Sequence, residues 1–275
     1  MNLKGKTALV TGANTGIGRV TAIELAKRGA RVVLACRSEE KTQPVIAEIG
    51  ADKVDFLQLD LADLASVRAS GDAFLARGEP LSLLVNNAGL AGAHGQTRDG
   101  FELGFGTNHV GHYLFTRLLL PALEKAEEAR VVTVASDGHY RAPGLDWEAV
   151  RRPTRTTTAF PEYCVSKLAN VLFASELARR APKNVRSYSL HPGGVASDVW
   201  REVPWGLRHV LRLFLLSNEE GARTTLYCAT SEDVKDESGL YYDRCKEKRP
   251  SKLALDASLA RELWERSAEW VGLAA

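Results

Sequence analysis

The chain has few cysteines and no long apolar runs. Its four cysteines, Cys36, Cys164, Cys228 and Cys245, lie far apart without a CxxC pair. That arrangement predicts free thiols in a reducing cytoplasm rather than a disulfide framework or a zinc site. No apolar run reaches the roughly 18 to 20 residues of a transmembrane helix, and the N-terminus has no signal-peptide pattern. We therefore expect a cytoplasmic chain without a transmembrane segment.

An excess of either charge is also missing, since the 275 residues carry a formal net charge of +2. Near-neutrality gives no support for nucleic acid as a partner. The GxSxG elbow of hydrolases and the HExxH motif of metalloproteases are absent. His109 and His112 stand three apart without a third ligand, so we predict no metal site. Because neither repeats nor a long linker divide the chain, residues 1–275 are predicted to form one domain.

Short runs rich in Val and Leu alternate along the chain with segments of helical apolar spacing. Strict alternation with nearly continuous apolar strands is typical of a parallel sheet covered on both faces. We therefore predict an α/β fold, a single-domain Rossmann-type doubly wound parallel sheet, with a surface loop over His139–Thr158. The expected strands are Lys6–Val10, Arg31–Ala35, Val54–Leu59, Leu81–Asn86, Arg130–Ser136 and Val185–His191, and the expected helices Ile17–Arg28, Lys41–Ile49, Leu64–Ala76, His109–Ala126 and Glu162–Arg180.

A glycine-rich turn, Thr11-Gly12-Ala13-Asn14-Thr15-Gly16-Ile17-Gly18, joins the first strand to the first helix. Glycines let a backbone turn tightly and approach a pyrophosphate, which is stabilised at the helix N-terminus. The alternative is an ordinary strand-to-helix turn. Its place at the start of an alternating pattern favours a dinucleotide site.

The TGxxxGxG spacing of this turn resembles the short-chain dehydrogenase/reductase family. The resemblance continues in the family's order through Asp60-Leu61, Asn86-Asn87-Ala88-Gly89, Asn108, Ser136, Tyr163-Cys164-Val165-Ser166-Lys167 and His191-Pro192-Gly193.

The resemblance implies a nicotinamide cofactor and the residues that bind it. Asp60, with Leu61 beside it, contacts the adenine; the alternative role of Asp60 is a turn or N-cap carboxylate. Lys167 holds the nicotinamide ribose. The other implied cofactor residues are Gly12, Asn14, Thr15, Gly16, Ile17 and Gly18 around the phosphates, Asn87, Ala88 and Gly89 along the ribose, and Pro192, Gly193 and Ser197 at the nicotinamide.

The end of the second strand bears on the choice between NAD(H) and NADP(H). Cys36 stands where NAD-preferring members place Asp, and Arg37 follows it. A guanidinium binds a 2′-phosphate through charge-assisted hydrogen bonds, and Arg19 is a candidate second charge. The alternative is that both arginines are solvated surface residues. The sequence favours NADP(H) over NAD(H).

Tyr163 and Lys167 are four residues apart in a helical pattern, so they share one helix face. A phenol with a pKa of about 10 is a poor base, and a nearby ammonium and an oxidised nicotinamide favour its ionised form. The resemblance implies that Tyr163 is the acid and base, that Ser136 binds the substrate oxygen, and that Asn108 supports a water chain from Lys167. The alternative for Tyr163 and Lys167 is an exposed helix surface. Cys164 is expected to be a buried structural thiol.

Three further stretches, Phe105–His112, Tyr163–Phe173 and the tail from Ser238–Tyr241 through Leu263–Glu265, look like the retinol dehydrogenase branch. That branch implies a lipophilic carbonyl or alcohol as substrate. The family builds a shared helix bundle on segments such as His109–Ala126 and Glu162–Arg180, so the resemblance also implies a homodimer.

The segment 199–217 is rich in apolar side chains interleaved with arginines. One interpretation is a lid over the substrate pocket, and the other is an amphipathic helix in peripheral contact with a membrane. Two other functions compete with catalysis of hydride transfer. One is an NADP(H)-sensing binding protein without turnover, and the other is a hydrolase built on Ser136 with Asp137 and His139.

Overall fold

The computed structural model describes residues 1–194 and 217–275, and in these ranges one mainly parallel sheet forms the centre of the molecule. The strand order is β3-β2-β1-β4-β5-β6-β7-β8, with β8 alone antiparallel to its neighbour. The strands are β1 (Thr7–Thr11), β2 (Arg31–Cys36), β3 (Val54–Gln58), β4 (Leu83–Asn86), β5 (Ala129–Val134), β6 (Val185–His191), β7 (Tyr241–Asp243) and β8 (Lys246–Glu247).

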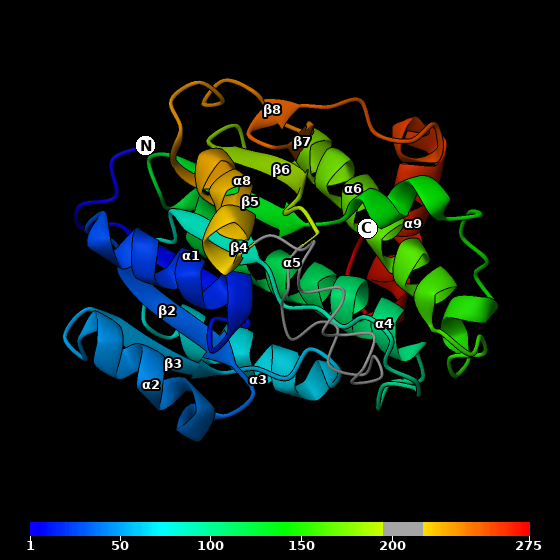
Figure 1. The fold of residues 1–275 in the computed structure, drawn as a ribbon, viewed down its shortest axis with the longest axis horizontal. Helices are drawn as coiled ribbons and strands as arrows, with labels where there is room; N and C mark the ends of the chain where they lie inside the picture. Colours follow the sequence, from blue (N-terminus) through cyan, green and yellow to red (C-terminus); the bar gives the residue numbers. More distant parts are fainter. Residues whose placement is uncertain (195–216) are drawn as a thin grey trace.

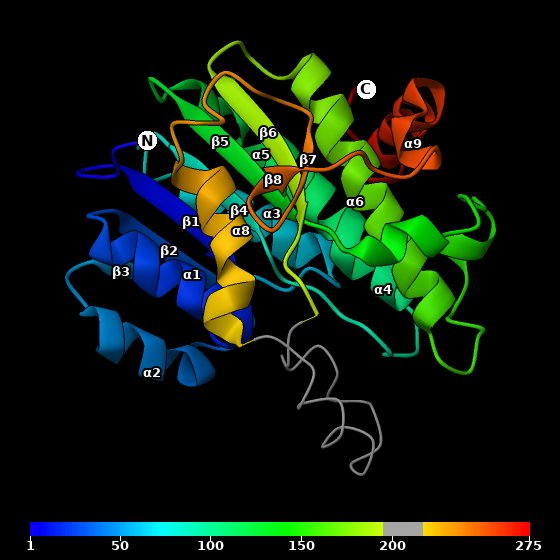
Figure 2. The ribbon, with the colours of Figure 1, turned by 45° about the horizontal axis from the view of Figure 1, so that its top comes forward.

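Helices cover both faces of this sheet (Figures 1 and 2). One apolar core lies under α1 (Gly16–Lys27), α2 (Glu39–Ile49) and α8 (Asn218–Thr230). The other lies under α3 (Leu64–Leu75), α5 (Gly111–Glu124), α6 (Phe160–Arg180) and α9 (Ala257–Trp270). Short segments complete the list: α4 (Leu103–Phe105), the π-helical turn η1 (Gly106–Val110), and the 3₁₀ turns η2 (Asp137–Arg141), η3 (Ala149–Arg151) and η5 (Leu253–Leu255).

The predicted fold class is confirmed, and the six expected strands occur within two residues of their predicted ends. The helix expected from His109 starts earlier, because α4, η1 and α5 follow one another without a break from Leu103. The helix expected from Glu162 starts at Phe160, after Ala159 with its left-handed φ of 52°. The expected surface loop His139–Thr158 is irregular apart from two 3₁₀ turns, but His139 itself is buried.

The strand order places β1 beside β4, so the connections that follow these strands run to opposite faces of the sheet. Ligands of doubly wound sheets bind at this switch point, outside the carboxyl ends of the strands. Of the segment predicted as a lid or membrane helix, residues 199–216 lie outside the described residues. Ser217, the last residue of that segment, is the N-cap of α8 in a capping box with Glu220.

No helix within residues 1–194 and 217–275 is both long and apolar enough to cross a bilayer.

Candidate active site

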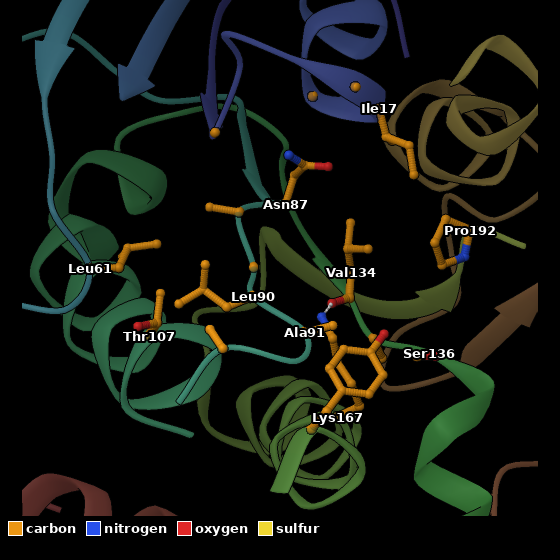
Figure 3. A pocket seen from close by; sticks show the side chains of 18 of the residues that line it. Ile17, Leu61, Asn87, Leu90, Ala91, Thr107, Val134, Ser136, Lys167 and Pro192 are labelled. Atoms are coloured by element: carbon orange, nitrogen blue, oxygen red, sulfur yellow. Dashed lines mark hydrogen bonds between the residues drawn. The ribbon is translucent and has the colours of Figure 1, made fainter. Parts of the chain in front are cut away.

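A cavity of about 570 Å³ opens at the switch point. Figure 3 shows Ile17 and Asn87 at one end of it and Ser136 and Lys167 at the other. Of the predicted site residues, Asn108 does not line the cavity and Ser197 lies outside the described residues. All the others line it: Gly12, Asn14, Thr15, Gly16, Ile17, Gly18, Arg37, Asp60, Leu61, Asn87, Ala88, Gly89, Ser136, Tyr163, Lys167, Pro192 and Gly193.

The glycine turn has the backbone that a phosphate cradle needs. Gly12 and Gly16 adopt φ values of 65° and 57°, in the region that favours glycine. A Cβ at Gly18 would lie 2.3 Å from the Gly12 carbonyl oxygen, so only glycine lets α1 start this close to the turn. The first turn of α1 carries no acidic residue, which leaves its positive end uncompensated within the helix. These residues fit a pyrophosphate.

Cys36 and Arg37 lie at the end of β2, where the cavity also reaches Asp60. Burial raises the pKa of the Cys36 thiol, so this position carries no negative charge. Arg37 is exposed, and its carbonyl accepts a hydrogen bond from Gln58 Nε2 at 2.8 Å. Arg19 differs, because it forms an ion pair with Glu48.

The Asp60 carboxylate accepts a hydrogen bond from the Ala62 amide at 3.0 Å, which is the turn role named as its alternative. That role is compatible with a contact to adenine, because Asp60 also lines the cavity.

Thr11, the last residue of β1, ties the turn to the wall that follows β4. Its Oγ1 accepts hydrogen bonds from the amides of Asn87 at 2.9 Å and Ala88 at 3.0 Å. Asn87 Nδ2 in turn donates to the Thr11 carbonyl at 2.9 Å. The two strand ends that separate at the switch point are therefore held together by three hydrogen bonds between Thr11 and the segment Asn87–Ala88.

Tyr163 and Lys167 project from one face of α6 into the other end of the cavity, as their spacing predicts. Lys167 Nζ lies 5.7 Å from the centroid of the Tyr163 ring and donates to the Val134 carbonyl at 2.9 Å (Figure 3). Ser136, just beyond β5, accepts the Gly138 amide at 3.1 Å through its Oγ.

Burial controls the acidity of both groups on α6. It raises the pKa of Tyr163 to about 12, although a hydrogen bond with Ser136 acts in the opposite direction. It also lowers the pKa of Lys167 to about 8. The expected lowering of the Tyr163 pKa by Lys167 is therefore corrected for the protein by itself, because burial of the phenol is the largest effect and raises its pKa. The result at neutral pH is a protonated phenol beside an ammonium group.

Asn108 lies within the π-helical turn η1 and is fully buried. Its side chain clamps Leu90, accepting from the amide at 2.8 Å and donating to the carbonyl at 3.0 Å. Its Nδ2 also donates to Ser166 Oγ on α6 at 2.9 Å. A Cβ at Gly89 would lie 3.3 Å from Asn108 Oδ1 and 3.5 Å from Lys167 Nζ, so the two side chains meet at this glycine. The water chain remains a prediction.

The hydrolase interpretation fails on the position of His139. Its Nδ1 lies 2.6 Å from the Ser136 backbone carbonyl, and its Nε2 accepts the Ser251 amide at 3.1 Å. Both ring nitrogens are therefore engaged away from the Ser136 hydroxyl, and His139 is not placed to be its base. Cys164 is a buried free thiol, as expected.

Sequence reasoning missed the apolar wall beside Tyr163. Phe160 stacks on the Tyr163 ring with centroids 6.2 Å apart, and Leu90 and Ala91 also line the cavity. Arg141 lies over the Phe160 ring, 5.8 Å from its centroid. One signal was available in the sequence, because Phe160 precedes Tyr163 by three residues on the same helix face.

Comparison with known proteins places the chain in one family. The family model described as short chain dehydrogenase matches residues 6–146. Human dehydrogenase/reductase SDR family member 13 is 45% identical, covering 99% of this chain and 74% of that protein. Mouse retinol dehydrogenase 11 is 41% identical, covering 99% and 88%. A crystal structure of an uncharacterized protein from Mycobacterium paratuberculosis superposes with a TM-score of 0.79 at 33% identity, covering 99% of this chain and 95% of that one. The chain therefore belongs to the short-chain dehydrogenase/reductase family of oxidoreductases, in its retinol dehydrogenase-like branch.

Proposed function

We propose that this chain transfers a hydride between NADP(H) and the carbonyl or alcohol carbon of a lipophilic small molecule. One observation carries the proposal: a single cavity joins the phosphate cradle of α1 to Ser136, Tyr163 and Lys167. A group bound along the cavity would extend from the cradle to the acid–base residues. The phosphate on the adenosine ribose of that group would lie at Arg37.

The residues that line the cavity have the properties that NADP(H) requires. The cradle and the start of α1 would bind the pyrophosphate, and Arg37 would bind the 2′-phosphate because Cys36 brings no negative charge. Asn87, Ala88 and Gly89 would follow the ribose to Lys167, with Pro192 and Gly193 at the nicotinamide. Ser197, proposed for the carboxamide, lies outside the described residues. The bound nicotinamide supplies or accepts the hydride.

The protein's own contribution is to hold the reacting oxygen and to move one proton. Ser136 would donate a hydrogen bond to the carbonyl oxygen of the substrate, and Tyr163, protonated at neutral pH, would give that oxygen a proton as the hydride arrives. Lys167 is held by the Val134 carbonyl and adds positive charge beside the phenol. The water chain that exchanges protons between Lys167 and solvent would run past Asn108.

The proposed substrate class is lipophilic because Leu90, Ala91 and Phe160 line the same cavity as Tyr163, and Phe160 stacks on its ring. Relatives named as retinol dehydrogenases support the same class. We therefore propose an aldehyde, ketone or alcohol with a large apolar part.

The test is to follow NADPH absorbance with a series of lipophilic aldehydes and ketones, in the wild type and in Tyr163→Phe. The substitution removes one hydroxyl, so NADPH affinity should stay within a few-fold while kcat falls by about 10²- to 10⁴-fold. A variant that keeps more than about a tenth of the activity would contradict the role of Tyr163. A wild type that binds NADPH but turns over no substrate in the series would favour the sensing protein.

A further inference from the structure

His112 is a buried histidine that the proposed mechanism does not use. It lies near two parts of the site: the cofactor wall, which is the segment Asn87–Ala88 bound to Thr11, and the catalytic helix, which is α6. It lies on the first turn of α5 with 1% of its surface exposed. Its ring reaches two residues on different elements. Nε2 lies 2.9 Å from Thr11 Oγ1 at the end of β1, and Nδ1 lies 3.0 Å from the Asn108 carbonyl oxygen in η1.

These contacts fix which ring nitrogen carries the proton. A carbonyl oxygen only accepts, so His112 Nδ1 must donate to Asn108. Thr11 Oγ1 already accepts the amides of Asn87 and Ala88, so its lone pairs are used and it can only donate to His112. Thr11 Oγ1 also lies 3.4 Å from the Val85 carbonyl oxygen, which is a longer contact for that proton than His112 Nε2 at 2.9 Å. In the neutral ring, Nδ1–H therefore donates to the Asn108 carbonyl, and the unprotonated Nε2 accepts from the Thr11 hydroxyl.

The charge state agrees with this assignment. Burial lowers the pKa of His112 to about 4, and the nearby Lys167 ammonium acts in the same direction. A protonated ring would direct Nε2–H at a hydroxyl oxygen whose lone pairs are occupied. His112 is therefore neutral across the physiological pH range.

We propose that His112 is a positioning residue that holds the cofactor wall and the catalytic helix in register. Through Thr11 it supports the Asn87–Ala88 segment, and through the Asn108 carbonyl it holds the turn whose side chain clamps Leu90 and bonds Ser166, next to Lys167. This inference rests on the proposed function, because it assigns one half of the network to cofactor binding and the other half to proton transfer.

Two variants separate the two halves. In His112→Asn the side-chain amide takes the place of Nδ1, so the bond to the Asn108 carbonyl survives and the bond to Thr11 is lost. In His112→Gln the amide reaches the place of Nε2, so the opposite bond survives. We expect the Asn variant to weaken NADPH binding by about 10-fold with kcat nearly unchanged, and the Gln variant to lower kcat by about 10-fold with NADPH affinity nearly unchanged.

His109→Gln is the matched control. His109 is an equally buried neutral histidine one turn earlier, and its Nε2 contacts Ser267 Oγ on α9 at 3.0 Å. Loss of the buried His109 ring should lower the melting temperature. It should not change one of NADPH affinity and kcat while leaving the other as it is in the wild type. A purely structural role of His112 predicts the same of its own variants. Equal changes of Kd and kcat in both His112 variants would overturn the proposal.

The tautomer is tested on the wild type without cofactor or substrate. A long-range ¹H–¹⁵N spectrum of the histidine rings should show His112 with a protonated Nδ1 and no titration between about pH 5 and 9. A protonated Nε2 would overturn the inference. Failure of the wild type to bind either nicotinamide nucleotide would instead overturn the proposed function, so the two failures are distinguishable.

Discussion

Two exposed arginines near the glycine turn differ in what they contact, and that difference makes a cofactor prediction testable. Arg37 lines the cavity, whereas Arg19 is paired with Glu48. We expect Arg37→Ala to weaken NADPH binding by roughly 10- to 150-fold and to leave NADH binding almost unchanged, because one charge-assisted contact is worth about 1.5–3 kcal/mol. Titration of both cofactors into the variant measures this.

Arg19→Ala is the control for that experiment. It removes the same charge but no residue of the cavity, so both cofactors should bind as they do to the wild type. The loss caused by Arg37→Ala should also shrink at high salt, since Arg37 is exposed. Equal losses for NADPH and NADH would mean that Arg37 supports the fold rather than the phosphate.

Lys167 makes a prediction about pH. Burial lowers its pKa to about 8, so the ammonium loses its proton at a lower pH than an exposed lysine does. If the charged form supports proton donation by Tyr163, kcat/KM for carbonyl reduction should fall as pH rises through about 8. In Lys167→Arg the fall should move to higher pH, because a guanidinium stays charged beyond pH 12. An unchanged profile in this variant would assign the titration to another group.

At the scale of elements, the start of α1 depends on a glycine that no other residue can replace without movement. A Cβ at Gly18 would meet Asn87 Nδ2 at 2.5 Å as well as the Gly12 carbonyl. Gly18→Ala should therefore push α1 away from the turn, at a cost of about 1–3 kcal/mol in stability, and weaken NADPH binding. Gly5→Ala, at a position with open space, should leave NADPH binding intact. Unchanged binding by Gly18→Ala would mean that the turn adapts.

The sequence predicts the elements that its own periodicity encodes and misses those that need tertiary partners. Val and Leu runs predict β1, β2, β4 and β5 because these strands are buried on both faces. The π-helical turn at Asn108 has the same apolar spacing as an α-helix, so no local pattern separates the two. The role of His112 depends on Thr11, about a hundred residues away in the chain, and sequence spacing carries no such information.

At the scale of the whole molecule, α9 bears on whether the chain self-associates. Its Trp264 is 4% exposed, stacks on Phe173 of α6 with centroids 6.0 Å apart, and meets the Tyr113 ring of α5 edge-on at 5.1 Å. The guanidinium groups of Arg117 and Arg180 lie 4.9 and 5.2 Å from its centroid. The resemblance implies a shared bundle built on α5 and α6. Both helices are already in contact with α9 of the same chain.

A helix face that α9 occupies is closed to a second copy, so we expect that the homodimer implied by the resemblance is not built on this face. Trp264→Ala should cost about 3–5 kcal/mol, because it removes a large buried ring from between α5 and α6. It should also uncover Tyr113 and Phe173, which together form an apolar patch of the kind that drives association. Sedimentation velocity and the melting temperature of the variant measure both effects. Arg261→Ala, at an exposed position of the same helix, should change neither. A wild type that sediments as a dimer, and stays a dimer in Trp264→Ala, would show that the chain associates through a different face.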